Sequence, residues 1–150
     1  MGGRRKAREL ALQMMYQIDL VNAKLEQMVT DFQPFQQCLP SIQDFSLDLV
    51  KRTLNNRQAI DELLAQCAQN WRIERMAIID RNILRLSICE LLYFPDIPGS
   101  VTINEAVEIA KKYGSEESSK FVNGILDAIA RGKCPEKLEF PIKIAPEGDL

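Results

Sequence analysis

The first pattern along the chain is a helical repeat of apolar side chains at three- and four-residue steps. It runs through residues 7–18 and predicts a first helix from about Arg4 to Asp19. The stripe consists of Ala7, Leu10, Ala11, Met14 and Ile18. A short second segment from Leu25 to Phe32 follows. Because Pro34 and Pro40 interrupt the pattern, we expect a loop from Gln33 to Asp44.

The apolar repeat resumes in the middle of the chain. From Phe45 to Gln69 it shifts phase across the polar run Asn55 to Gln58, which indicates one long helix or two helices joined at a bend. The next segment, Arg75 to Phe94, is apolar on most sides. A helix without a polar face belongs inside a molecule, so we expect this one at the centre.

Two more helices are predicted near the C-terminal end. Thr102-Ile103-Asn104-Glu105 has the S/T-x-x-E pattern of a helix-capping box, and Gly114 is a stop signal. Ser115 can cap a last helix that ends near Arg131. We expect residues 132–150, which hold three prolines, to form an extended or disordered tail. Since no segment alternates like a strand, the prediction is an all-α protein of about six or seven helices, with residues 1–131 as one domain.

Composition narrows the classes of function. The 150 residues are 46% hydrophobic, enough for a real core, and 19 basic residues face 21 acidic ones, so any basic site must be local. No apolar run is long enough to cross a bilayer, and we expect a cytoplasmic protein. The chain contains no histidine, which excludes Ser-His-Asp triads and histidine-zinc sites. The four scattered cysteines indicate reduced, mostly buried thiols.

The sharpest local charge lies at the N-terminus. Residues 1–10 contain four basic side chains, Arg4, Arg5, Lys6 and Arg8, against one acid, Glu9. At the start of a helix they could contact RNA phosphates, with arginine adding paired hydrogen bonds and stacking on unpaired bases. Short basic N-termini are also common in proteins that bind no nucleic acid, and composition alone favours that interpretation.

The stretch from Gly114 to Gly124 offers a second candidate site. A helix start, hydroxyl groups, Lys120 and the ring of Phe121 can hold a phosphate and stack on a base. The alternative is structural: Ser115 caps the helix and Phe121 fills the core, which the apolar spacing favours for Phe121.

Charges also interrupt the central helix. Asp80, Arg81, Arg85 and Glu90 predict either internal ion pairs or a surface for a partner, and the spacing does not separate the two. Glu105 and Glu108 lie on a helix that needs a solvated face, so we assign them no catalytic role. The glycines form no phosphate-binding loop, which argues against nucleotide binding. We expect no cofactor, no metal and no enzymatic activity.

Three blocks of sequence together resemble the NusB family over about residues 4–131. They are Arg4-Arg5-Lys6-Ala7-Arg8-Glu9 with Ala11, Gln13 and Tyr16; Asp80-Arg81-x-x-Leu84-Arg85-Leu86 with Glu90-Leu91; and Pro98 to Val101, Ile103-Asn104-Glu105-Ala106-Val107-Glu108 and Ala110-Lys111, leading to Lys120-Phe121-Val122-Asn123-Gly124. The resemblance implies a NusB-type helical bundle in two packed halves, here residues 1–70 and 71–131. It also implies a transcription antitermination factor that binds boxA-like single-stranded RNA with NusE, a small-subunit ribosomal protein, in an RNA polymerase antitermination complex.

The resemblance also assigns roles to individual residues. It places RNA-binding residues at Arg4, Arg5, Lys6, Arg8, Glu117, Lys120 and Phe121, and a NusE-binding surface at Tyr16, Asp80 and Arg85. For Phe121 this reverses the interpretation from apolar spacing.

Two other functions stay open. One is a helical interaction scaffold without an RNA site of its own. The other is a stand-alone relative of the NusB-like domain of ribosomal RNA methyltransferases, although the chain ends where a catalytic domain would begin. A homodimer is also possible.

Overall fold

The computed structural model describes residues 2–68, 72–134 and 137, and these residues form helices joined by short connections. The helices are α1 (Gly2–Val21), α2 (Leu25–Asp31), α3 (Gln33–Gln36), α4 (Pro40–Asn55), α5 (Arg57–Cys67), a 3-10 helix (Ile73–Arg75), α6 (Ile78–Tyr93), α7 (Gly99–Tyr113) and α8 (Glu116–Lys133). The described residues contain no strand, so the predicted all-α class is confirmed, with eight α-helices instead of six or seven.

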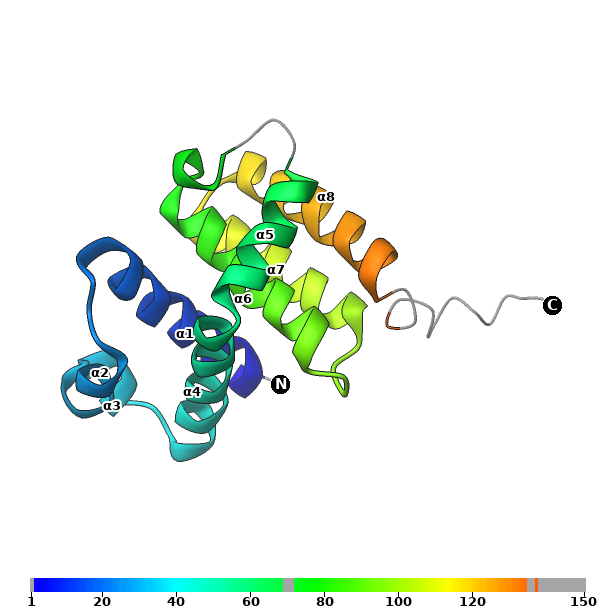
Figure 1. Cartoon of the computed structure of the whole chain (residues 1–150). Coiled ribbons are helices and arrows are strands. Elements are labelled where there is room, and N and C mark those ends of the chain that lie inside the picture. Colours follow the sequence, from blue (N-terminus) through cyan, green and yellow to red (C-terminus); the bar gives the residue numbers. More distant parts are fainter. Residues whose placement is uncertain (1, 69–71, 135–136, 138–150) are drawn as a thin grey trace.

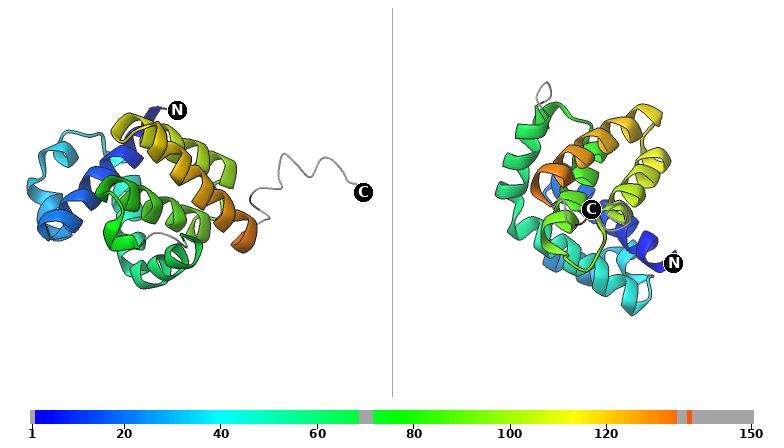
Figure 2. Two further views of the ribbon diagram at one scale, coloured as in Figure 1. Left: turned by 90° about the horizontal axis from the view of Figure 1, so that it is seen from above. Right: turned by 90° about the vertical axis from the view of Figure 1, so that its right-hand side faces the viewer.

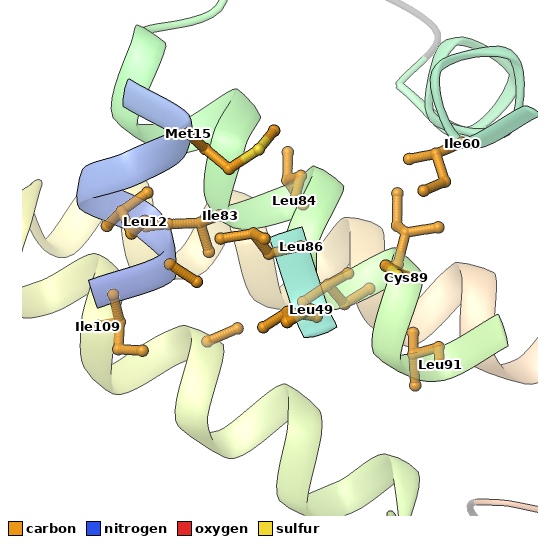
Figure 3. Close-up of a cluster of buried hydrophobic side chains, with 14 of the residues drawn as sticks. Leu12, Met15, Leu49, Ile60, Ile83, Leu84, Leu86, Cys89, Leu91 and Ile109 are labelled. Atoms are coloured by element: carbon orange, nitrogen blue, oxygen red, sulfur yellow. The ribbon is translucent and has the colours of Figure 1, made fainter. Parts of the chain in front are cut away.

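Helix α6 lies at the centre of the molecule, as its apolar sequence predicts. It packs against α1, α4, α5, α7 and α8, and every residue from 82 to 91 is buried. Figure 1 shows α6 behind α5 and between α1 and α8. Figure 3 shows how Leu12 of α1, Leu49 of α4 and Ile109 of α7 point toward Ile83 and Leu86 of α6. Burying so many apolar side chains supplies the main driving force for this fold.

The other helices pack around α6 and against one another. α1 packs along α4, and α7 along α8, while α2 and α3 pack on each other at one side of the molecule, at the left of the left-hand view of Figure 2. α5 packs against α6 and α8. The connection predicted to separate the two halves, residues 69–71, lies outside the described residues, and the division at residue 70 stays a prediction.

The predicted loop from Gln33 to Asp44 is wrong for most of its length. It contains α3, and α4 begins at Pro40. Both prolines lie in the first turn of their helices. A proline there loses no hydrogen bond and its fixed φ suits a helix, so these residues start helices instead of breaking them.

The predicted capping box is also wrong, because α7 begins earlier, at Gly99. Thr102 lies inside the helix and is buried, and its hydroxyl donates to Oε1 of Glu90 at 2.9 Å. The cap at Ser115 is confirmed, since its Oγ accepts from the amide of Ser118 at 3.1 Å. The phase shift near residue 56 marks two helices, α4 and α5, with Asn56 between them.

The tail predicted from residue 132 is wrong at its start. Gly132 and Lys133 belong to α8. Lys137 is buried, and its Nζ donates to the carbonyl oxygens of Glu90 and Phe94, both at 2.9 Å, at the end of α6. Most of the segment predicted to be extended, including residues 138–150, lies outside the described residues.

Candidate nucleic-acid and partner interfaces

The four basic residues of α1 have different environments because successive side chains leave a helix in different directions. Arg8 faces inward and is only 7% exposed. Its Nε donates to Oε2 of Glu90 at 2.7 Å, and its Nη2 donates to Oε1 at 3.0 Å. Glu90 is itself 2% exposed and also accepts from Thr102. Arg8 therefore joins α1 to α6, and Thr102 connects α7 to the same carboxylate. The guanidinium of Arg8 is paired with Glu90 inside the protein.

Arg5 is half-exposed and forms a paired interaction with another carboxylate. Its Nε and Nη2 donate to the two oxygens of Glu105 on α7, the second at 2.9 Å. The hydrogen bond from Arg5 is the main reason that the pKa of Glu105 is lowered, and the same bond raises the pKa of Arg5. Glu105 therefore holds the guanidinium of Arg5 in position.

Arg4 and Lys6 are the exposed cations of this stretch. The guanidinium of Arg4 lies 4.1 Å from the centre of the Phe45 ring on α4, which is a cation–π distance. This contact fixes the position of Arg4 without neutralising its charge. The sequence reasoning missed Phe45, since nothing in its spacing points to α1.

A surface groove adjoins this basic end. It has a volume of about 570 Å³ and lies between α1 and the start of α7. Its lining combines three cations, two acids and an apolar floor: Arg4, Arg5, Arg8, Asp96, Glu105, Ile97, Pro98 and Val101. Of these cations Arg4 is exposed and Arg5 is half-exposed, so the groove offers positive charge beside apolar groups, an arrangement that can receive a phosphate backbone with its sugars.

The turn between α7 and α8 forms the second candidate site. A Cβ on Gly114 would lie 2.6 Å from Oγ of Ser118 and 2.9 Å from the carbonyl oxygen of Ala110, so only glycine allows α8 to start this close to α7. Glu117 and Lys120 follow on the first turns of α8 and are exposed. The turn thus presents both charges to solvent.

Phe121 fits both interpretations drawn from the sequence. It is half-buried and packs against the core, and it also lines a cleft with a volume of about 360 Å³. The other lining residues come from the segment before α6 and from the starts of α6 and α8: Arg75, Met76, Ala77, Asp80, Glu117 and Ser118. The structure therefore brings Asp80, predicted on the partner surface, beside two residues predicted to bind RNA.

The Asp80 carboxyl group has an unusual environment. Its Oδ1 is buried and has no hydrogen-bond partner in the described part of the chain. Burial raises the pKa of Asp80, and a hydrogen bond with Ser118 opposes that rise. An unpaired buried acceptor is costly, so this oxygen is a candidate to meet a donor from outside the chain.

Arg85 does not reach the surface. Its side chain is 4% exposed and is held by Asp61 of α5 through two hydrogen bonds of 2.9 and 3.1 Å. It also donates to Asp19 of α1 at 3.1 Å and to Asn82 at 3.2 Å. Of the two interpretations of the central-helix charges, internal ion pairs describe Arg85. Tyr16 is half-buried, and the structure does not group it with Asp80 and Arg85 in one cleft.

Asp19 completes this network between α1 and α6. Burial alone would raise the pKa of Asp19, but hydrogen bonds from Arg81 and Asn82, with the charges of Arg81 and Arg85, outweigh it and lower the pKa to about 2. The shortest bond, from Nε of Arg81, is 2.7 Å. Asp19 and Asp61 were not predicted, because their partners lie far away in sequence.

Other kinds of site find little support among the described residues. They contain no group of three or more His, Cys, Asp and Glu side chains placed to hold a metal ion. None of their helices is long and apolar enough to cross a membrane. All four cysteines are free thiols, two buried and two half-buried.

The fold and these surfaces define a class of small all-α proteins, built around one buried helix, with a basic first helix and an aromatic cleft at the start of the last. The model of the NusB family matches residues 5–131. This chain therefore belongs to the NusB family, as the three sequence blocks indicated.

Individual relatives agree over nearly the whole chain. The transcription antitermination protein NusB of Citrifermentans bemidjiense is 47% identical over 135 residues, which cover 85% of this chain and 93% of that protein. The protein of the same name from Myxococcus xanthus is 46% identical over 134 residues, covering 87% and 96%.

Solved structures show the same fold. NusB from T. maritima superimposes with a TM-score of 0.80 at 36% identity, covering 93% of this chain and 97% of that one. A chain from a crystal structure of the antitermination factors NusB and NusE in complex with dsRNA gives a TM-score of 0.77 at 26% identity, covering 88% and 98%.

Proposed function

We propose that this protein is a non-enzymatic transcription antitermination factor that acts in the cytoplasm with RNA polymerase. It binds boxA-like single-stranded RNA together with a NusE partner and so supports processive transcription of ribosomal RNA. The observation that carries the proposal is the pair of exposed cations on α1 of a NusB-family chain, Arg4, which lines the groove, and Lys6. Support comes from relatives named as antitermination proteins and from a similar chain in a complex with NusE and RNA.

The RNA surface has its first part on α1. Arg4 and Lys6 contact backbone phosphates directly, since their charges face solvent. Arg5 contributes a third contact by exchanging Glu105 for a phosphate, which has a similar geometry for two parallel hydrogen bonds. Arg8 supports this surface from below by holding α1 on α6.

The second part of the RNA surface lies on the first turns of α8. Lys120 contacts a phosphate, and Phe121 offers its ring to an unpaired base. Glu117 stands at the rim of the same cleft. Its negative charge limits affinity for the RNA backbone.

The NusE surface is centred on Tyr16, with Asp80 and Arg85 as the other members that the family resemblance supplies. The buried position of Arg85 favours an indirect role, in which it fixes α1 and α5 against α6 and so shapes the surface. Tyr16 is half-buried and can contact a partner. Asp80 lies in the aromatic cleft, beside Glu117 and Phe121.

The test is the salt dependence of binding to a labelled boxA-like single strand, measured by fluorescence anisotropy with and without NusE. Each phosphate contact contributes about -0.7 to the slope of log affinity against log salt. Arg4→Ala and Lys6→Ala should therefore each flatten the slope by about 0.7, and NusE should strengthen binding. Lys24→Ala, an exposed lysine beyond the end of α1, is the matched control and should leave the slope unchanged.

Two results would contradict the proposal. If a scrambled strand binds as tightly as the boxA-like strand, with and without NusE, the chain has no specific RNA function. If Arg4→Ala and Lys6→Ala leave the slope unchanged while Tyr16→Ala abolishes NusE binding, the protein is an interaction scaffold.

A further inference from the structure

The ring of Phe45 carries an inference that rests on the proposed function and deepens it. Phe45 is half-buried on α4, and the guanidinium of Arg4 lies over its ring at 4.1 Å from the ring centre. The guanidinium of Arg8 lies over the same ring at 5.5 Å. Figure 1 shows α4 beside the start of α1, and the two helices pack on each other. The ring therefore supports the segment of α1 that the proposed function assigns to RNA.

Arg4 differs from Arg5 and Arg8 in the kind of group that holds it. Arg5 and Arg8 are each paired with a carboxylate, which accepts two of their hydrogen bonds and balances their charge. The ring of Phe45 is uncharged, and the guanidinium of Arg4 donates no hydrogen bond to any described residue. An arginine has five N–H donors in one plane, in a geometry that matches a phosphate. Arg4 is thus held in place while its donors stay open.

The ring of Phe45 is in turn held by the end of α6. It meets the ring of Phe94 edge to face, with the two ring centres 5.9 Å apart. Phe94 is buried, and the guanidinium of Arg52 lies over its ring at 4.4 Å. Arg52 also donates to the carbonyl oxygen of Tyr93 at 2.7 Å. Because its neighbours fix the orientation of the Phe45 ring, Arg4 rests on an ordered support.

We propose that Phe45 is a positioning residue for RNA binding, which holds the guanidinium of Arg4 at the groove, ready for a backbone phosphate. A long side chain that is mobile before binding loses rotamer freedom when it binds, and this loss weakens affinity. The cation–π contact reduces the loss because it orders Arg4 before the RNA arrives. Arg4 lines the groove and Phe45 does not, so the proposed role of Phe45 is exerted through Arg4.

The proposal separates the position of a charge from the charge itself. Phe45→Leu keeps an apolar side chain on α4 and every charge of the RNA surface, but it removes the ring. Affinity for the boxA-like strand should therefore fall about twofold to fivefold, the strength of an exposed cation–π contact. The slope of log affinity against log salt should stay unchanged, because the number of cations is the same. Phe45→Tyr keeps the ring and should bind as tightly as the wild type.

The test is a double-mutant cycle on the boxA-like strand, with affinity measured by fluorescence anisotropy on the full chain. The four proteins are the wild type, Phe45→Leu, Arg4→Ala and the double variant. If Phe45 acts through Arg4, Phe45→Leu weakens binding in the wild-type background and has no effect once Arg4 is alanine. A purely structural role would weaken binding equally in both backgrounds.

Phe35→Leu is the matched control. Phe35 is a buried phenylalanine of α3, and no cation among the described residues lies over its ring. Its replacement should lower the thermal stability at least as much as Phe45→Leu, since Phe35 is more deeply buried, and should leave RNA affinity unchanged. Circular dichroism of each variant verifies folding before the comparison.

Three outcomes would overturn the inference. An equal loss of affinity in both backgrounds would mean that Phe45 acts on the fold or on the RNA without Arg4. An unchanged affinity of Phe45→Leu would mean that the ring does not position Arg4. A loss in Phe45→Tyr as large as in Phe45→Leu would mean that the ring is not the group that matters. The proposed function survives all three, because it fails only if the wild type binds the boxA-like strand no better than a scrambled strand.

Discussion

The buried pair between Arg8 and Glu90 gives the sharpest prediction about stability. Arg8→Ala removes two hydrogen bonds, of 2.7 and 3.0 Å, from a carboxylate that is 2% exposed. Glu90 keeps a bond from the hydroxyl of Thr102, but its charge stays buried without a cation. Removing one partner of a buried pair typically costs about 3–5 kcal/mol. Since domains are stable by about 5–15 kcal/mol, this loss is a large share of the total.

The assay is urea unfolding followed by circular dichroism, with the free energy of unfolding taken from the linear extrapolation. We expect Arg8→Ala to lower it by about 4 kcal/mol. The matched control is an exposed pair, Lys111 with Glu108, whose atoms are 3.8 Å apart. Lys111→Ala should cost less than about 1 kcal/mol, because exposed pairs contribute little.

A double variant separates the charge from the packing. Arg8→Met with Glu90→Leu replaces the pair by apolar groups of similar volume and should recover most of the loss. Thr102 can then donate to the carbonyl oxygen one helical turn earlier. If this folded variant loses about 0.7 of the salt slope for RNA binding, Arg8 contacts a phosphate and its assignment as a supporting residue is refuted. An Arg8→Ala cost below about 1 kcal/mol would refute the buried pair itself.

Three further predictions concern stability in acid, two glycines and the charge of Glu117. The folded pKa of Asp19, about 2, lies below its ordinary 3.8, so the unfolded chain binds more protons between these two pH values. The free energy of unfolding should therefore fall by about 2 kcal/mol as the pH drops from about 5 to 2. In Asp19→Asn, urea unfolding should show a smaller loss of stability over the same pH range. Gly114→Ala should lower the free energy of unfolding by about 1–3 kcal/mol, because the new Cβ would lie 2.6 Å from Oγ of Ser118. Gly124→Ala should raise it by about 0.5–1 kcal/mol, because Gly124 lies inside α8 and a Cβ there would meet nothing within 4 Å. Thermal unfolding of both variants decides whether close approach or helix propensity controls these sites. Glu117→Gln should tighten binding of a boxA-like strand about twofold to fivefold by relieving repulsion, and an unchanged affinity would place the RNA backbone away from α8.

The helices could be predicted because their signals are local. The apolar stripe of α1 and the apolar sequence of α6 are visible within a few turns of chain, and burial follows from them. The wrong predictions came from residue types that occur in two different structural settings. Pro34 and Pro40 break a helix in its interior but favour its first turn, and Thr102 resembles a cap until its true partner, Glu90, is seen.

The site could be predicted by position but not by environment. Charge density marked the segment from Arg4 to Arg8, and only the family resemblance assigned it to RNA. In the structure Arg4 and Lys6 are exposed to solvent, whereas Arg8 is paired with Glu90. The two residues of that pair are 82 positions apart, so no spacing rule connects them. The family resemblance placed Asp80 and Arg85 together on the surface expected to bind NusE. Five positions on a helix point to different sides, which sent Arg85 inward and Asp80 into the cleft.

The charges of α6 make the two proposed RNA surfaces depend on one helix. Glu90 holds the basic start of α1, and Arg81 and Arg85 hold its far end through Asp19. Asp80, on the same helix, lines the cleft of Phe121. Removing one member of either pair would leave a buried charge without its partner, so both ends of α1 are tied to α6. Since α1 and α8 both pack on α6, this helix sets the spacing between the two surfaces proposed to bind RNA, and an RNA that contacts both must span that spacing.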